Sequence, residues 1–354
     1  MALSIGIIGM PNSGKTALFT AMTRGEAEAT SYAFSTVEAN TGIVPVPDDR
    51  LQALADIVNP KKIVDATVEF VDIAGLVKGA STGAGLGNQF LANIRDADAL
   101  VEVIRYFEDE NVMHVDGVID PESDAETIKL ELIFADMGTV ERVVDRLEKE
   151  SKKDKSLAPK LELVKRVGAH LENGERALTM EMTDEERALL HDLHLLTMKP
   201  VLYVANVDED RILDSVDAID GITPIPICAR VEYDLASLEP EEAAEFLAEL
   251  GVEQTGLHRL IQAAYRLLGL QSYFTAGEPE VRAWTIPIGA KAPQAASVIH
   301  TDFERGFIKA EVIGYDDYVE LKGEKGAREA GKMRLEGKDY VVKDGDVVHF
   351  RFNV

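Results

Sequence analysis

Apolar and polar positions along the first 110 residues predict strands that alternate with helices. The apolar runs at 3–9, 68–75 and 99–105 each have the length of a buried strand, and stretches of helical character lie between them. This order is typical of a mainly parallel sheet covered by helices. The strand pattern returns at 200–210 and 223–229, so we predict one α/β domain that a different segment interrupts.

The interrupting segment has the period of amphipathic helices. Apolar residues recur at threes and fours from Leu132 to Leu147, and again from Leu161 to Leu171. The lysine-rich stretch 152–156 separates the two runs and is expected to be the turn between them. We therefore predict a helical hairpin or coiled-coil arm inserted into the sheet domain.

Two short patterns predict where helices of this arm begin. Ser123 followed by Glu126, and Thr183 followed by Glu186, both have the spacing of a capping box. The first would open the long helix of the arm. The second would open a third helix that runs to about Leu196.

After Gly277 the chain changes to β alternation separated by Gly and Asp turns. We predict at most one helix there, between Ala292 and Ser297, and therefore a small, independent β-rich module. The expected domains are the sheet domain at 1–120 and 200–277, the helical insertion at 121–199, and the C-terminal module at 278–354.

Composition limits the classes of protein that this chain can belong to. It has 354 residues, 46% of them hydrophobic, which is enough for two or three domains. No apolar run is long enough to span a membrane, and residues 1–4 lack the pattern of a signal peptide. The single cysteine excludes an internal disulfide. We expect a cytoplasmic protein with no membrane partner.

The charge of the chain is strongly acidic and unevenly distributed. Its 63 acidic and 37 basic residues give a net charge of −26, whereas residues 281–354 are neutral. A body this acidic is repelled by nucleic-acid phosphates, so we expect no direct DNA binding. An RNA partner would have to meet a local patch, such as the neutral C-terminal module or the lysines of the arm turn, or a bound protein.

The stretch GMPNSGKT, residues 9–16, has the pattern of a phosphate-binding loop. A strand-like run precedes it and a helix-forming run follows, which is the context that the motif requires. Gly9 and Gly14 would let backbone N–H groups face the β- and γ-phosphates at a helix N-terminus. Lys15 would place its ammonium on the same oxygens, and Thr16 would offer a hydroxyl to Mg²⁺.

Two further positions give the order of motifs found in GTPase-like domains. Asp72 ends an apolar strand and would hold Mg²⁺ through water, while the N–H of Gly75 would meet the γ-phosphate. Between this motif and the phosphate loop, Thr36 is the best candidate for a switch threonine that joins the metal ligands when γ-phosphate is bound.

The sequence departs from Ras-like GTPases at two places. Leu76 stands where those enzymes carry a water-orienting glutamine, so hydrolysis needs another group, a partner, or a K⁺ ion held with Asn12. The guanine-reading motif Asn-Lys-x-Asp is replaced by residues 206–209, in which Val207 and Glu209 take the places of lysine and aspartate. Loss of the aspartate removes a pair of hydrogen bonds to guanine, which favours adenine.

Together, GMPNSGKT, FSTVEAN (34–40), residues 72–91, NVDE (206–209), the helical arm and residues 299–313 and 345–354 resemble the YchF family, the Obg-like ATPases. The resemblance spans essentially the whole chain. It implies an α/β P-loop NTPase (G domain) with an inserted coiled-coil arm and a C-terminal, β-grasp-like TGS domain. It also implies a slow, ribosome-stimulated ATPase that prefers ATP to GTP, with Mg²⁺ as cofactor and the ribosome as partner.

The resemblance also suggests a substitute for the missing glutamine, namely His114 on a mobile loop. Without it, His114 would be read as a surface residue, because no acid or base is fixed beside it in sequence. With Lys15 and Gly75 it forms the predicted catalytic set, and Thr16, Thr36 and Asp72 form the predicted metal set. The predicted nucleotide contacts are Gly9, Pro11, Asn12, Ser13, Gly14, Lys15, Thr16, Ala17, Asn206, Val207, Glu209, Cys228 and Ala229.

Two alternative functions stay open at this point, and a third is disfavoured. An ordinary Obg-type GTPase remains possible if Glu209 still reaches guanine. A nucleotide-gated binding protein with incidental hydrolysis would carry the same motifs. A small-molecule kinase is disfavoured, because nothing after Asp72 supplies a base for an acceptor substrate. Cys228, taken alone, is read as a small buried residue on a strand.

Overall fold

The computed structural model describes residues 3–23, 40–73, 86–115 and 117–353. The contacts within it divide the chain into two compact units. The first unit contains Met1–Ile43 and Glu69–Leu260, and the second contains Val44–Val68 and Ile261–Val354.

The first unit is built on a six-stranded sheet with the strand order β2-β4-β1-β5-β6-β7. The pairs β1–β4, β1–β5, β5–β6 and β6–β7 are parallel, so their carboxyl ends lie at one edge. Every residue of the central strand β5 is buried, which explains why most of its residues are apolar. The predicted α/β sheet is confirmed, with strands β1 (Ser4–Ile8), β2 (Asn40–Val46), β4 (Ala66–Asp72), β5 (Ala99–Arg105), β6 (Val201–Asn206) and β7 (Ile225–Ile227).

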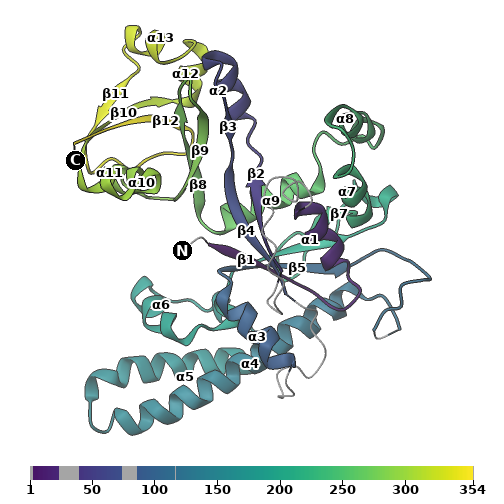
Figure 1. Ribbon diagram of the computed structural model, residues 1–354. Coiled ribbons are helices and arrows are strands. Elements are labelled where there is room, and N and C mark those ends of the chain that lie inside the picture. Colours follow the sequence, from purple (N-terminus) through teal and green to yellow (C-terminus); the bar gives the residue numbers. More distant parts are fainter. Residues whose placement is uncertain (1–2, 24–39, 74–85, 116, 354) are drawn as a thin grey trace. The chain divides into compact units, whose positions relative to one another are not determined.

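Helices follow most of these strands in the chain, as Figure 1 shows. Ile94 of one of them packs with Leu100 and Ile104 of β5 in a fully buried cluster, which also includes Ile128 at the start of the arm. The sheet-domain helices are α1 (Lys15–Thr23), α3 (Leu86–Asp96), α7 (Ala229–Leu235), α8 (Pro240–Glu249) and α9 (Gly256–Leu267), with a 3-10 turn η7 (Glu209–Arg211).

The predicted helical arm is present as a hairpin of two long helices, α4 (Pro121–Glu150) and α5 (Ala158–Glu172) (Figure 1). Val140 and Leu147 of α4 pack against Val164 and Val167 of α5 in a common apolar cluster. Although α4 is long, no helix in the described residues is both long and apolar enough to cross a membrane. Short elements complete the arm, namely η3 (Lys155–Leu157), η4 (Ala177–Thr179), α6 (Asp184–Leu190), η5 (His191–Leu193) and η6 (Leu196–Met198).

One of the two predicted helix starts is wrong. The cap of α4 is Asp120, whose carboxylate accepts a hydrogen bond from the backbone N–H of Ser123 at 3.1 Å, so Ser123 lies inside the first turn. Pro121 occupies the first helical position, where its missing N–H costs nothing. An aspartate followed by proline was therefore the stronger start signal than the Ser123–Glu126 spacing.

The capping box of Thr183 with Glu186 is confirmed by both of its hydrogen bonds. The helix that it opens ends at Leu190, however, and does not reach Leu196. A 3-10 turn follows, and His194 then takes a left-handed conformation with φ of 46°, which stops any further helix.

A buried polar cluster joins the base of the arm to the sheet. Arg176, which follows α5, lies 3.7 Å from the carboxylate of Glu102 on β5 and 3.4 Å from that of Asp220. The Arg176 guanidinium also donates to the hydroxyl of Tyr203 on β6 at 3.0 Å. Lys129 of α4 reaches Asp220 at 3.2 Å. Both ends of the arm thus contact Asp220, and Arg176 also contacts β5 and β6.

Burial raises the pKa of the Glu102 carboxyl to about 8, although Arg176 opposes the shift. The folded protein therefore keeps a proton on Glu102 that the unfolded chain releases above its ordinary pKa near 4.5. Since the unfolded state binds fewer protons in this window, stability should fall as the pH rises from about 4.5 to about 8.

We expect Glu102→Gln to remove this fall, because the amide cannot ionise. At pH 8 the variant should gain as much as about 4 kcal/mol in free energy of unfolding over the wild type, at 1.36 kcal/mol per pKa unit. Urea unfolding at pH 5.5 and pH 8 measures the difference. Glu141→Gln, an exposed change on α4, is the control. Equal pH slopes in the wild type and Glu102→Gln would contradict the assignment.

The second unit is built on another six-stranded sheet, with the order β11-β10-β12-β8-β9-β3. Ala292 and Ala296 of α10 pack against Tyr273 and Phe350 of this sheet, which gives the unit its own core. Its strands are β3 (Ile63–Val64), β8 (Leu270–Ala276), β9 (Val281–Pro287), β10 (Phe307–Gly314), β11 (Arg334–Glu336) and β12 (Asp346–Phe352). Its helices are α2 (Arg50–Val58), α10 (Ala292–Ile299), α11 (Thr301–Arg305), α12 (Tyr315–Glu320) and α13 (Glu324–Glu329).

The second unit differs from the expected C-terminal module in its content and extent. The expectation of at most one helix is wrong, since four helices lie after residue 277. Strand β8 precedes that residue but pairs along its length with β9, so the unit begins before the expected boundary. Segment 44–68, expected in the sheet domain, also belongs to this unit.

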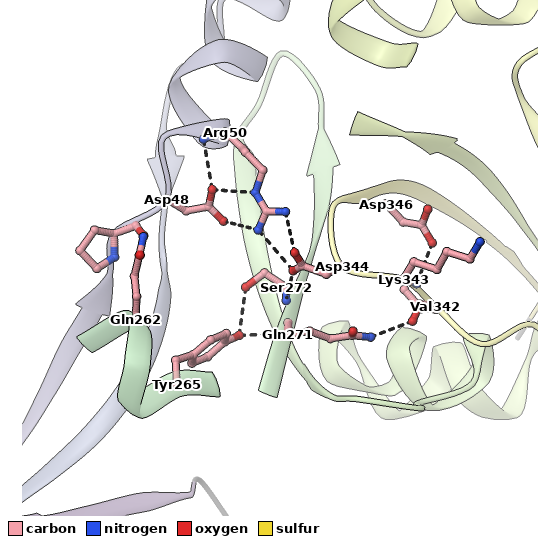
Figure 2. Close-up of polar contacts among 11 residues, drawn as sticks. Asp48, Arg50, Gln262, Tyr265, Gln271, Ser272, Val342, Lys343, Asp344 and Asp346 are labelled. Carbon is pink, nitrogen blue, oxygen red and sulfur yellow. Dashed lines mark hydrogen bonds and ion pairs between the residues drawn. The ribbon is translucent and has the colours of Figure 1, made fainter. Parts of the chain in front are cut away.

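Arg50 accounts for the placement of that segment. Its guanidinium binds the carboxylates of Asp48 and Asp344, each at 2.8 Å, and so joins α2 to the loop before β12 (Figure 2). The side-chain amide of Gln262 donates to the carbonyl of Pro47 at 3.0 Å and joins the same segment to α9. These contacts connect residues far apart in sequence, which local pattern cannot reveal.

Candidate nucleotide-binding site

The predicted phosphate loop connects β1 to α1 at the carboxyl edge of the first sheet. A Cβ atom on Gly9 would lie 2.8 Å from the Ser13 hydroxyl and still closer to a backbone carbonyl of β5. Gly14 has φ of 97°, and a Cβ there would collide with the side chain of Asn206. Both glycines are therefore required by close approach of the chain, as the motif predicted. Pro11 lies between them, half-buried.

Lys15 is the first residue of α1 and is largely buried. Its ammonium donates to the carbonyl of Met10 within the loop at 3.2 Å. Burial lowers the pKa of this lysine, and the nearby Asp72 carboxylate partly offsets the effect. The backbone N–H groups of Lys15, Thr16 and Ala17 belong to the first helical turn and have no partner within the helix, so they are suited to an anion.

Thr16 and Asp72 meet at the mouth of the loop. The Thr16 hydroxyl donates to the Asp72 carboxylate at 3.5 Å, although the residues are 56 positions apart. Burial raises the pKa of Asp72, and Lys15 and Thr16 counteract that rise. A hydroxyl and a carboxylate are the hard oxygen ligands that Mg²⁺ prefers. The other predicted metal and switch positions, Thr36, Gly75 and Leu76, lie outside the described residues.

Asn206 joins the phosphate loop to the next part of the predicted site. Its side chain is buried at the end of β6, and its amide nitrogen donates to the carbonyl of Ser13 at 2.9 Å. Its amide oxygen accepts from the backbone N–H of Ala229 at 3.0 Å. One side chain thus fixes the loop that would hold phosphates to the segment that would hold the base.

Val207, Cys228 and Ala229 are all buried around Asn206. The backbone N–H of Val207 donates to the carbonyl of Ile227 at 2.9 Å, which holds the two strand ends together. Cys228 was expected on a strand, but it follows β7 and takes the N-cap position of α7. Burial raises the pKa of its thiol, as suits a small packing residue.

Glu209 lies at the exposed end of this region, in turn η7. Its carboxylate is 3.4 Å from the guanidinium of Arg230 on α7, and both side chains are largely in solvent. Asp208 points elsewhere, because its carboxylate accepts from the backbone N–H of Glu108 at 3.2 Å. Glu209 therefore faces α7, whereas Asp208 faces the loop after β5.

A loop after β5 brings His114 to the same edge of the sheet. Arg105, fully buried at the end of β5, donates to the carbonyls of Phe107 at 3.1 Å and Val112 at 2.8 Å. The amide nitrogen of Asn12 in the phosphate loop donates to the carbonyl of Met113 at 3.0 Å. Hydrogen bonds from Arg105 therefore stabilise this loop, and the hydrogen bond from Asn12 attaches it to the phosphate loop at Met113, the residue before His114.

The interpretation of His114, taken alone, as a surface residue is wrong, because its side chain is buried beside an acid. Its Nε2 atom lies 3.0 Å from the carboxylate of Asp124 in the first turn of α4. Both side chains are only 5% exposed. The pairing was hidden in sequence because the two residues are ten positions apart, and only Asp124 lies in a helix.

Three residues of the site escaped the sequence reasoning. Asp124 was hidden as one more acid in a polar helix turn, and Arg230 is an exposed helix residue with no motif of its own. Arg105 could have been found, since an arginine that ends a buried strand needs several acceptors nearby. The arrangement can cradle phosphates at an N-terminus, hold a divalent cation at its mouth and admit a base beside Glu209.

Comparisons with known proteins give matches over the whole chain. A family model described as 50S ribosome-binding GTPase matches residues 4–135. The YchF GTPase C-terminal model, described as a protein of unknown function (DUF933), matches residues 270–353. Proteins named ribosome-binding ATPase YchF from Haemophilus ducreyi and Bacillus subtilis are 53% and 52% identical over 363 and 366 aligned residues, covering 100% of each chain.

A solved structure gives the same result for the fold. The structure of the Schizosaccharomyces pombe YchF GTPase covers 99% of this chain and 97% of its own, with a TM-score of 0.87 and 36% sequence identity. This chain therefore shares its P-loop domain, its helical insertion and its C-terminal β domain with a solved relative.

Proposed function

The chain belongs to the YchF family. From this premise we propose that it is a ribosome-binding ATPase and a molecular switch, whose conformation depends on whether ATP is bound. Water would attack the γ-phosphorus, and the bond to the oxygen that bridges the β- and γ-phosphates would break, which gives ADP and phosphate. The partner, a ribosome or its large subunit, and the cytoplasmic location belong to the same proposal.

The bridge made by Asn206 is the observation that carries the proposal. It holds the phosphate loop and the N-terminus of α7 at fixed hydrogen-bond distances, 2.9 and 3.0 Å, so that one molecule can span both. A nucleotide is the ligand class that offers phosphates at one end and a base at the other. Gly9, Ser13, Gly14, Lys15 and Ala17 would contact the phosphates.

Mg²⁺ is part of the proposed site. Thr16 and Asp72 would hold it, Asp72 through water, and Thr36 would join them when γ-phosphate is bound. The described residues contain no cluster of three or more His, Cys, Asp or Glu side chains, which suits an ion that takes most of its ligands from phosphate and water. When bound, Mg²⁺ would neutralise charge that develops on the phosphate oxygens. If K⁺ also activates hydrolysis, the amide oxygen of Asn12 is the atom that would hold it.

A preference for ATP over GTP follows from Glu209. Guanine is normally clamped by an aspartate that accepts both N1–H and the 2-amino group, and a glutamate is one methylene too long for that geometry. The ion pair with Arg230 further removes the Glu209 carboxylate from use as a clamp. Adenine has an acceptor at N1 and no 2-amino group, so its binding does not depend on that clamp.

The catalytic role proposed for His114 is to orient or polarise the attacking water. Lys15 and the N–H of Gly75 would stabilise the charge on the γ-phosphate in the same step. The attachment of Met113 to Asn12 supports this role, because it holds the backbone of the histidine loop at the phosphate loop. The imidazole would have to change its position to meet the attacking water, because it now lies against Asp124.

An Obg-type GTPase is the second candidate. The description of the matching N-terminal family and that of the fission-yeast structure both use the word GTPase. Glu209 is half exposed, and its partner Arg230 is more so, so the carboxylate is not locked in place. This candidate differs from the first in base preference alone.

Single-turnover hydrolysis with and without ribosomes tests the proposed switch. We expect ribosomes to raise the hydrolysis rate at saturating ATP, because a partner must complete a site that lacks a glutamine at Leu76. Isolated large and small subunits in separate reactions would show which surface acts. A rate unchanged over a wide range of ribosome concentrations would reject the switch and leave a nucleotide-gated binding protein.

A further inference from the structure

His114 is held in a buried position by the arm. The imidazole Nε2 and the Asp124 carboxylate lie 3.0 Å apart, and each side chain is 5% exposed. The hydrogen bond joins the loop after β5 to the first turn of α4, which is the helix that forms one side of the arm. A bond to a charged acceptor in such a covered place is stronger than one in solvent.

The backbone of this loop and the side chain of His114 make contacts with different parts of the protein. The carbonyl of Met113 accepts from Asn12 of the phosphate loop, so the main chain lies at the candidate nucleotide site. The side chains of Met113 and Val115 are 81% and 52% exposed, whereas the imidazole between them is covered. A ring that is covered in this way cannot meet a water molecule above the exposed phosphate loop unless it leaves Asp124.

We propose that Asp124 is a positioning residue that holds His114 withdrawn from the phosphate loop, and that movement of the first turn of α4 releases the imidazole for hydrolysis. This inference rests on the proposed catalytic role of His114. It adds the element that controls the histidine and connects that element to the arm.

The rest of α4 is suited to transmit such a movement. It is a continuous helix of 30 residues, about 45 Å long at 1.5 Å per residue. Lys129, in the turn that follows Asp124, binds Asp220 at 3.2 Å, and Asp220 also binds Arg176 at the other end of the arm. A partner that binds near the arm turn would therefore act on both ends of the arm together.

The geometry disfavours a second role for Asp124, in which it would orient a catalytic His114 as the aspartate of a serine protease does. There the aspartate holds one ring nitrogen while the other faces the reacting group. Here the whole imidazole is covered, so Asp124 keeps His114 from a reacting group at the phosphate loop. The two roles predict opposite changes in basal rate when Asp124 is removed.

The test measures basal and ribosome-stimulated hydrolysis of Asp124→Ala and Asp124→Asn in the full chain, together with the rate at which diethyl pyrocarbonate modifies His114. Loss of one hydrogen bond should raise both the basal rate and the modification rate of Asp124→Ala roughly 3- to 10-fold. The stimulation by ribosomes should shrink by the same factor, with KM for ATP unchanged. Asp124→Asn, a neutral acceptor of nearly the same shape, should fall between.

Asp120→Asn is the matched control, because asparagine caps α4 equally well and does not touch His114. If Asp124→Ala does not fold, Asp124→Asn carries the test. Modification of His114 at the wild-type rate, or a basal rate that falls with the stimulated rate, would overturn the inference. If His114→Ala hydrolyses ATP at the wild-type rate, the proposed catalytic role fails, and the modification assay still decides whether Asp124 holds the ring.

Discussion

Lys15→Met should weaken binding of ATP by at least about 100-fold, because it removes the one ammonium of the phosphate loop. In the structure this ammonium lies against the carbonyl of Met10, and burial lowers its pKa. Phosphate oxygens would add negative charge to that of the nearby Asp72 carboxylate. Methionine keeps the length of the side chain and adapts to the same space, so the loop should retain its shape. Isothermal titration with a non-hydrolysable ATP analogue measures the loss.

Lys199→Met is the matched control for this experiment. Lys199 is a half-buried lysine whose ammonium, like that of Lys15, donates to backbone carbonyl oxygen, and burial likewise lowers its pKa. It lies before β6, outside the predicted site. We expect this variant to lose some stability and to bind the ATP analogue as the wild type does. Equal losses of affinity in the two variants would mean that Lys15 acts through the fold and not through phosphate.

His114→Ala should lower the single-turnover rate of ATP hydrolysis by about 100- to 10,000-fold, the usual range for a group that positions or deprotonates water. The dissociation constant for the ATP analogue should stay within about twofold, because the proposed role begins only when water attacks the γ-phosphate. Rapid-quench measurement of product at saturating enzyme separates the two effects.

His191→Ala provides the control, since His191 is an exposed histidine of the arm region. It should leave both binding and hydrolysis unchanged. The catalytic assignment would have to be given up if His114→Ala lost less than about twofold in rate. It would be revised to a binding role if affinity fell by the same factor as the rate.

The first sheet and its phosphate loop could be predicted because their signals are local. Gly9 and Gly14 stand at spacings that only a tight loop needs, and the strand before them is a continuous apolar run. The contact of Thr16 with Asp72 followed from topology, since the carboxyl ends of neighbouring parallel strands share one edge. The long hairpin of the arm was equally visible, because its apolar period is sustained over several turns.

The remaining features depend on contacts between distant residues. The pairing of His114 with Asp124 and that of Arg50 with Asp344 have no local pattern, because each partner alone looks like an ordinary charged residue. The helices of the second unit are mostly five to eight residues long, too short to show a clear period, and they are stabilised by the sheet that they cover. The start of α4 was predicted at the wrong residue because the sequence holds two start signals there. The helix begins after Asp120, which a proline follows, and not at Ser123.

The central claim is that residues 206–209 make this nucleotide site an adenine site. The most direct measurement is the dissociation constant for non-hydrolysable analogues of ATP and of GTP, each with Mg²⁺, on the wild type and on Glu209→Asp. Asp210→Asn, on the same exposed turn, is the control. We expect the wild type to bind the ATP analogue more tightly and Glu209→Asp to move the preference toward GTP. Tighter binding of the GTP analogue by the wild type would contradict this claim.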